Sequence, residues 1–153
     1  MSAARTLVDT NVIVAAVEAD HPHHLQSAAL FTDNRSLSVA AHSCAEAFDT
    51  LTRRGTNAPF GRPADKAWAS LAAVLAVTDM VGLTAAQTLD TIRSFAERGG
   101  IGARLYDRLI GEVAVRNGIP AIVTWNVGHM RGLFPDLSVL TPPEMSQQQG
   151  RTR

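Results

Sequence analysis

Cysteine is nearly absent from this sequence: Cys44 is the only one among 153 residues, so no internal disulfide can form. A chain without cysteine pairs is typical of a reducing compartment, and we expect a cytoplasmic protein. The sequence also lacks any apolar run near the roughly 20 residues of a membrane-spanning helix. The apolar stretch at the N-terminus is broken by Asp9 and Asn11 and preceded by a single Arg, which is unlike a signal peptide. We therefore expect no membrane partner.

An excess of charge of one sign is missing too. The formal net charge is zero, so overall charge does not point to nucleic acid as a partner. Lysine is almost absent, since Lys66 is the only one and the other basic residues are thirteen arginines. Guanidinium groups suit bidentate contacts with phosphate, but an Arg- and Ala-rich composition also follows from genome bias. The arginine content alone therefore leaves RNA binding open.

The sequence does contain enough apolar material for one core, because 46% of its residues are hydrophobic. A domain of this size buries roughly 70% of its unfolded-chain surface and needs no disulfide or structural metal for stability. We expect a single domain over residues 1–145. Residues 146–153, with the sequence SQQQGRTR, contain no apolar side chain and are predicted to form a disordered tail.

Short β-rich runs alternate with longer helical patterns along the chain. Strands separated by helices imply right-handed crossovers and a parallel sheet with helices on both faces. We therefore predict an α/β fold, a three-layer α/β/α sandwich with a mainly parallel central sheet. The predicted strands cover about residues 6–9, 37–40, 80–83, 121–125 and 138–140, and the predicted helices cover about 11–17, 23–31, 43–54, 63–77, 84–98 and 103–117.

Two acidic residues follow predicted strands. Asp9 ends the first strand, and ligands bind at the carboxyl ends of strands in parallel sheets. The alternative is that Asp9 caps the next helix. Glu46 lies in the pattern Ser43-Cys44-Ala45-Glu46, which fits a capping box. The same first-turn position also places Glu46 beside the end of the second strand. A metal ligand and a helix cap look alike at both positions.

Asp107 has a different setting, inside a predicted helix. Its neighbours on the helix surface are apolar or small, and they include Ile110 and Gly111. A carboxylate on such a stripe requires a cation or a hydrogen-bonding partner, because an unpaired buried charge is costly. A structural salt bridge to an arginine is the alternative to a metal. Gly111 would let another group approach closely.

A fourth position follows the strand Ala121-Ile122-Val123, where the chain reads Thr124-Trp125-Asn126. Asn126 lies at a strand's carboxyl end, although an isolated Asn is commonly a turn residue or a cap. Trp125 fits a packing role better than a base-stacking one.

Taken in order, LVDTNVIVAA, SCAEAFDTLTR and ARLYDRLIGEVAVRNGIPAIVTWN resemble the PIN-domain family, and within it the VapC-type toxins of prokaryotic toxin–antitoxin pairs. The resemblance implies a compact α/β/α metal-dependent ribonuclease whose motif carboxylates correspond to Asp9, Glu46 and Asp107. The family often has Asp at the fourth position, where this chain has Asn126. An amide orients water or metal without adding negative charge, so the affinity for a second metal is in doubt.

The resemblance also implies partners, namely an RNA substrate, a cognate antitoxin protein and a second copy in a homodimer. The cofactor expected is Mg²⁺ or Mn²⁺, because these ions prefer hard oxygen ligands and clustered carboxylates repel each other without a cation. Such an ion activates water and orients phosphate, so no Ser, Cys or His nucleophile is needed.

Two other functions remain open. A phosphatase-like hydrolase would use Asp9 as nucleophile, but it usually has a second acid two residues on, where this chain has Asn11. A degenerate PIN-like module would hold RNA or protein without cleavage, and Asn126 is the residue that favours it.

The remaining polar residues have simpler interpretations. The local cluster His21, His23 and His24 is read as an exposed loop and helix start, because a metal site there would lack further ligands. His129 is either a substrate contact or a surface histidine. Four arginines are candidates for phosphate contacts, or else for helix and surface charges: Arg53, Arg54, Arg104 and Arg108.

Overall fold

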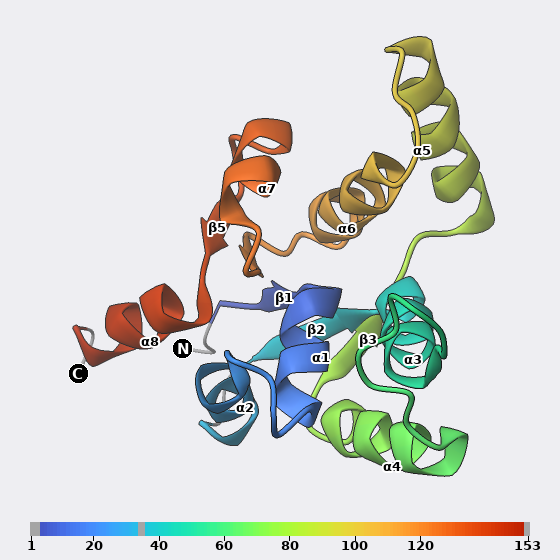
Figure 1. The fold of residues 1–153 in the computed structure, drawn as a ribbon. Helices are drawn as coiled ribbons and strands as arrows, with labels where there is room; N and C mark the ends of the chain where they lie inside the picture. The colour runs from blue at the N-terminus through green and yellow to red at the C-terminus, as the bar shows by residue number, and fades with distance from the viewer. Residues whose placement is uncertain (1–3, 34–35, 152–153) are drawn as a thin grey trace.

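A five-stranded sheet runs through the middle of the protein, as the computed structural model shows (Figure 1). The structure describes residues 4–33 and 36–151. All paired strands are parallel, in the order β3-β2-β1-β4-β5. The strands are β1 (Thr6–Val8), β2 (Leu37–Ala40), β3 (Asp79–Val81), β4 (Ala121–Val123) and β5 (Ser138–Leu140).

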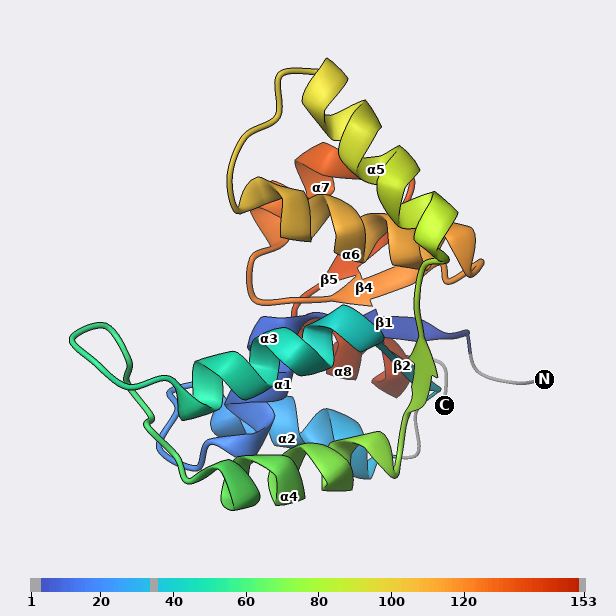
Figure 2. The same ribbon diagram turned by 90° about the vertical axis from the view of Figure 1, so that its right-hand side faces the viewer.

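Helices cover both faces of this sheet, which makes the three layers of an α/β/α sandwich (Figures 1 and 2). One face carries α1, α2, α3 and α4, and the other carries α6 and α7, with α5 on the outer side of α6. The predicted fold class is confirmed. The helices in the described residues are α1 (Thr10–Val17), α2 (His24–Thr32), α3 (Ala41–Thr52), α4 (Ala64–Leu75), α5 (Ala85–Glu97), α6 (Arg104–Arg116), α7 (Val127–Leu133) and α8 (Pro142–Gly150).

The core has two parts because neighbouring residues of a strand point to opposite faces. In β1, Leu7 packs into the cluster under α6 and α7, while Val8 packs into the cluster under α1 to α4. Ile122 and Val123 divide between the two clusters in the same way in β4. Central strands of a parallel sheet are therefore mostly apolar on both faces, although buried Thr6 and Ser38 also stand in β1 and β2. This explains the continuous apolar runs that the sequence shows.

The expectation of a disordered tail from residue 146 was wrong for residues 146–150, which belong to α8. Thr141 and Glu144 form a reciprocal capping box at its start, and Pro142 is in the first turn. Met145 is buried and packs into the core. One cap and one buried anchor are thus enough to order a polar segment. Residues 152–153 of the predicted tail lie outside the described residues.

Two helix starts also differ from expectation. The sequence did not predict α7, which has no side-chain cap and is held by buried Met130. Helix α3 begins at Ala41, directly after β2, instead of at Ser43. None of the helices in the described ranges is long and apolar enough to cross a membrane.

Candidate functional site

The carboxyl ends of β1 and β4 lie side by side in the sheet, since Val8 pairs with Val123. The next residues, Asp9 and Thr124, are therefore neighbours although they are far apart in the sequence. The Thr124 hydroxyl donates to Asp9 Oδ2 at 2.8 Å, and the Thr10 N–H donates to Asp9 Oδ1 at 2.7 Å. Asp9 thus caps α1 and also belongs to a contact between two strand ends. The cap and the site interpretation of Asp9 do not exclude each other.

Asn11 binds the same two strand ends together. Its side-chain N–H donates to Thr124 Oγ1 at 3.1 Å, and its Oδ1 accepts from the Trp125 N–H at 3.1 Å. In the sequence, Asn11 counts against a signal peptide and against a second acid, and Thr124 had no predicted role. The available signal was position, because Thr124 directly follows β4 and Asn11 lies three residues after the end of β1. Asn11 and Thr124 are the residues that orient Asp9.

Asp107 lies in the first turn of α6 and faces α7. Its Oδ2 lies 3.2 Å from Nε2 of His129, at ion-pair distance but without hydrogen-bond alignment. Among the described residues Asp107 has no arginine partner, so the salt bridge considered from sequence is a histidine contact instead. Burial raises the pKa of the Asp107 carboxyl, and the charge of His129 partly opposes this rise. Ile110 and Gly111 beside it are buried, as the predicted apolar stripe requires.

Glu46 lies in the second turn of α3, because the helix begins at Ala41. It therefore does not form the capping box considered from sequence, and the Ser43 hydroxyl has no hydrogen-bond partner among the described residues. Glu46 Oε1 is buried without a hydrogen bond in the same part of the chain, with His42 Nε2 3.7 Å away. Burial lowers the pKa of His42, which weakens it as a cationic partner. An orphaned carboxylate oxygen requires another partner.

The three acids influence one another electrostatically. Burial raises the pKa of Asp9 and of Glu46, and Asp107 raises both further by repulsion. Asp9 also raises the pKa of Glu46. Asp9 and Asp107 line one pocket of about 360 Å³, together with residues that include His21 and Phe60. The acids converge on one region, although no three His, Cys, Asp or Glu side chains in the described ranges are grouped closely enough to hold a metal as placed.

Asn126 occupies a less central position than the three acids. It is exposed at the start of α7, and its backbone N–H donates to Thr124 Oγ1 at 3.0 Å. Trp125 is a packing residue: its ring stacks on His23 at 3.9 Å, and its Nε1–H donates to Ser27. His23 is thus part of a packed contact, and His21 lines the pocket of the acids, so the cluster is closer to the site than expected.

A parallel sheet with polar side chains at the carboxyl ends of adjacent strands is the arrangement in which α/β proteins bind ligands. The profile of the PIN domain matches residues 6–128, and the chain belongs to this family. The family predicted from the sequence motifs is confirmed. None of the curated protein sequences compared with the chain matches it.

Solved structures with this fold include toxins and toxin–antitoxin complexes. The sarcin-ricin loop cleaving toxin VapC20 of Mycobacterium tuberculosis is 19% identical, with a TM-score of 0.60 over 76% of this chain and 86% of that chain. DNA-bound VapBC of Salmonella typhimurium is 18% identical, with a TM-score of 0.61 over 93% and 99%. VapBC2 of Rickettsia felis, bound to a promoter DNA fragment, is 16% identical, with a TM-score of 0.62 over 90% and 98%. These similarities show a shared fold.

Proposed function

We propose that this protein is a metal-dependent endoribonuclease that hydrolyses RNA phosphodiester bonds, and that it is the toxin of a type II toxin–antitoxin pair. The observation that carries the proposal is the convergence of Asp9, Glu46 and Asp107 at the carboxyl ends of the central strands. Burial raises the pKa of all three carboxyl groups, and charge repulsion from the other acids adds to the rise at Asp9 and Glu46. Such mutual repulsion in a folded protein is relieved when a cation binds.

The donors fit a hard divalent cation, Mg²⁺ or Mn²⁺, because all three are carboxylates. Glu46 Oε1 has no hydrogen-bond partner within the described ranges, so it is free to accept a metal. Asp9, Glu46 and Asp107 would hold the ion, and Asn126 would contribute its amide at the rim. When bound, the ion lowers the pKa of a water molecule and stabilises negative charge on the phosphate.

The chain's own polar residues hold these ligands in place. Thr124 and the Thr10 amide fix both oxygens of Asp9, and Asn11 keeps Thr124 in position. His129 approaches Asp107 from α7, with its Nε2 3.2 Å from Asp107 Oδ2. Such outer contacts commonly orient metal ligands. They explain how carboxylates from one strand end and two helices stay ordered.

The partners that we propose follow from the family and from the neighbouring structures. VapBC and FitAB structures are complexes, and those of Salmonella typhimurium and Rickettsia felis contain DNA. We propose a cognate antitoxin that inhibits this chain, a homodimer, and the cytoplasm as its location. The single Cys44 is consistent with a reducing compartment.

The decisive experiment is incubation of the purified protein with total RNA in Mg²⁺, in Mn²⁺ and in EDTA. We expect internal cleavage with either metal and none in EDTA. An Asp9→Asn variant purified identically controls for contaminating ribonuclease. Intact RNA in all three conditions, with RNA still bound, would replace the proposal with the binding module that exposed Asn126 favours. Metal-dependent release of phosphate from a phosphomonoester would instead favour the phosphatase-like hydrolase.

A further inference from the structure

A second pocket, of about 380 Å³, is lined by residues of α5, α6 and α7 and of the loop between α5 and α6. Four arginines line it, against the two carboxylates of Asp90 and Glu112. Figures 1 and 2 show α5 extending over α6 at this end of the molecule, away from the sheet. The arginines that define the "arginine groove" below are Arg98, Arg104 and Arg108.

The arginine groove is positively charged because its carboxylates already have partners. Arg116 contacts Asp90 at 3.2 Å and Glu112 at 3.5 Å, and Arg93 also pairs with Asp90. Arg98, Arg104 and Arg108 form no ion pair with any carboxylate in the described ranges. Like charges gathered without counter-charges repel each other, and an anion would relieve this. Guanidinium forks bind phosphate oxygens in particular.

The groove is preorganised by packing. Arg104 and Arg108 are one turn apart on α6 and so share a face of the helix. The Arg108 guanidinium lies 4.9 Å from the centre of the Phe134 ring, a cation–π contact that orders it. Phe134 in turn lies against Gly111, where an added Cβ would come within 1.9 Å of the ring. The absence of a side chain at position 111 thus makes room for the ring that holds Arg108.

His129 connects the groove to the acidic site. It lines the groove, and its Nε2 lies 3.2 Å from Asp107, which lines the pocket of Asp9. The two pockets are therefore neighbours, separated by the Asp107–His129 contact. A chain with regularly repeated phosphates could lie in both at once, with one phosphate at the acids and others at the arginines.

We propose that the arginine groove binds the sugar–phosphate backbone of the RNA next to the bond that is cleaved, and so determines the direction in which the strand leaves the site. This inference rests on the proposed function. Arg104 and Arg108 are positioning residues for substrate, and they act on any sequence alike because they contact phosphate. Arg53 and Arg54, beyond α3, have no part in it.

Binding in EDTA tests the groove independently of cleavage. The probe is a short fluorescein-labelled oligouridylate, titrated with the full-length protein at several salt concentrations and followed by fluorescence anisotropy. Each lost phosphate contact lowers the slope of log affinity against log salt by about 0.7 for a single strand. We expect Arg104→Gln to lower the slope by about 0.7, and Arg104→Gln with Arg108→Gln by about 1.4, each with severalfold weaker binding at low salt.

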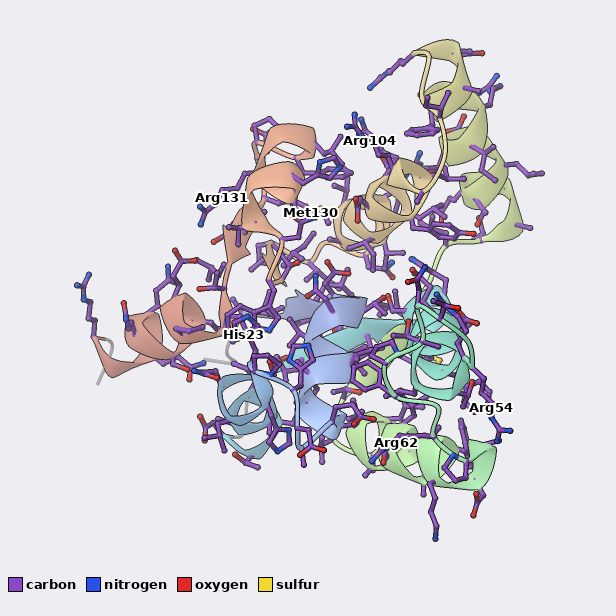
Figure 3. All side chains as sticks on the ribbon, in the orientation of Figure 1. His23, Arg54, Arg62, Arg104, Met130 and Arg131 are labelled. Atoms are coloured by element: carbon purple, nitrogen blue, oxygen red, sulfur yellow. The ribbon has the colours of Figure 1, made fainter. Side chains whose placement is uncertain are left out.

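Arg54→Gln is the matched control. Arg54 is also exposed, belongs to the loop after α3 and lies far from Arg104 in Figure 3. Its slope should equal that of the wild type. Arg104 is exposed, so Arg104→Gln tests the groove even if the Arg108 variant is poorly folded by circular dichroism. If Arg104→Gln binds RNA like the wild type, or if Arg54→Gln loses as much RNA affinity as Arg104→Gln, the proposed role of the arginine groove is wrong.

The outcomes also separate this inference from the proposed function. If the wild type cleaves RNA with metal but the arginine-groove variants bind RNA normally, the proposed function stands and the proposed role of the arginine groove is wrong. If the wild type binds RNA through the arginine groove but never cleaves it, the proposed role of the groove stands and the proposed nuclease function is wrong.

Discussion

Asp9 accepts hydrogen bonds at both carboxylate oxygens, one from the first turn of α1 and one from Thr124. Its exposed fraction is 7%, so these bonds replace much of its hydration. Burial nevertheless raises its pKa, which means that the hydrogen bonds do not fully compensate the lost water. A carboxylate held in this way has a defined direction but an unsatisfied charge, as a metal ligand needs.

Asp9→Asn separates the charge of this residue from its cap. Asn caps helices as well as Asp does, so the Thr10 N–H keeps its acceptor in the variant. We expect unfolding free energy within about 1 kcal/mol of the wild type. Cleavage should fall about 100-fold or more, because a lost metal ligand removes several kcal/mol of transition-state stabilisation. Chemical denaturation and RNA cleavage rates measure the two, and full activity in the variant would exclude Asp9 as a ligand.

Glu46 predicts a pH dependence of stability in the metal-free protein. Burial and the charges of Asp9 and Asp107 place its folded pKa above its unfolded one. Between the ordinary and the raised pKa of Glu46, the folded protein binds more protons than the unfolded one. The charge of Glu46 therefore does not destabilise the folded state below this pH range, and destabilises it increasingly as pH rises through the range. Glu46→Gln removes this destabilisation. Its melting midpoint in EDTA, minus that of the wild type, should increase from acid to neutral pH.

Glu144→Gln is the control with the opposite sign. The Thr141 backbone N–H donates to the Glu144 carboxylate and is the main cause of its lowered pKa. The charged Glu144 carboxylate stabilises the folded protein above the pKa that Glu144 has in the unfolded chain, and this stabilisation is lost as pH falls through its pKa in the folded protein. The midpoint difference for Glu144→Gln should therefore become more negative towards neutral pH. Two variants with the same trend would show that Glu46 is not under electrostatic strain.

At the scale of elements, α6 and α7 are joined through a position without a side chain. Gly111 is buried in α6, and the Phe134 ring at the end of α7 fills the space beside it. The same ring packs under Arg108, so the contact between the two helices also arranges one wall of the arginine groove. The expectation that something approaches Gly111 closely is confirmed, and the approaching group is Phe134.

Gly111→Ala tests this contact. Alanine favours a helix by about 1 kcal/mol over glycine, but the new Cβ would meet a buried ring at 1.9 Å. Overpacking costs about 1–3 kcal/mol, so we expect net destabilisation by chemical denaturation. Gly132→Ala in α7 is the control, since a Cβ there meets nothing within 4 Å. It should be neutral or slightly stabilising, and equal effects at both positions would contradict the packing argument.

At the scale of the whole molecule, the acids come from separate parts of the sandwich. Asp9 follows β1, Glu46 belongs to α3 and Asp107 belongs to α6, on the two faces of the sheet. An ion bound by all three would connect the layers. Metal should therefore stabilise the folded state as a whole, because the unfolded chain does not keep the ligands together.

The measurement is a thermal melt of the wild type and of Asp107→Asn, in EDTA and in Mn²⁺. Mn²⁺ at a hundred times its dissociation constant adds about 2.7 kcal/mol to the unfolding free energy of a protein with one site. We expect a raised midpoint for the wild type and a much smaller rise for Asp107→Asn. In EDTA the variant should be no less stable, because one partly buried charge near two other acids is removed. Equal shifts with Mn²⁺ and a weaker variant in EDTA would make Asp107 a structural acid.

The sequence by itself determined the layers of this protein. Apolar runs such as residues 7–8 and 121–123, separated by amphipathic helices, require a parallel sheet covered on both faces. They also place Asp9 and Thr124 at strand ends. These are local properties, readable from periodicity and from the neighbours of each residue. The family followed from the order of the motifs, and all of this needs no knowledge of distant contacts.

Only the tertiary structure decided which partner each acid has. His129 reaches Asp107, Thr124 reaches Asp9, and both contacts join segments that the sequence keeps apart. The tertiary structure also determined the start of α3, because the buried end of β2 leads directly into the helix. Glu46 is therefore a residue of the second turn. Capping patterns describe single turns, whereas burial and ion pairs depend on which elements meet. Local reasoning therefore predicted the acids as candidates and could not predict their surroundings.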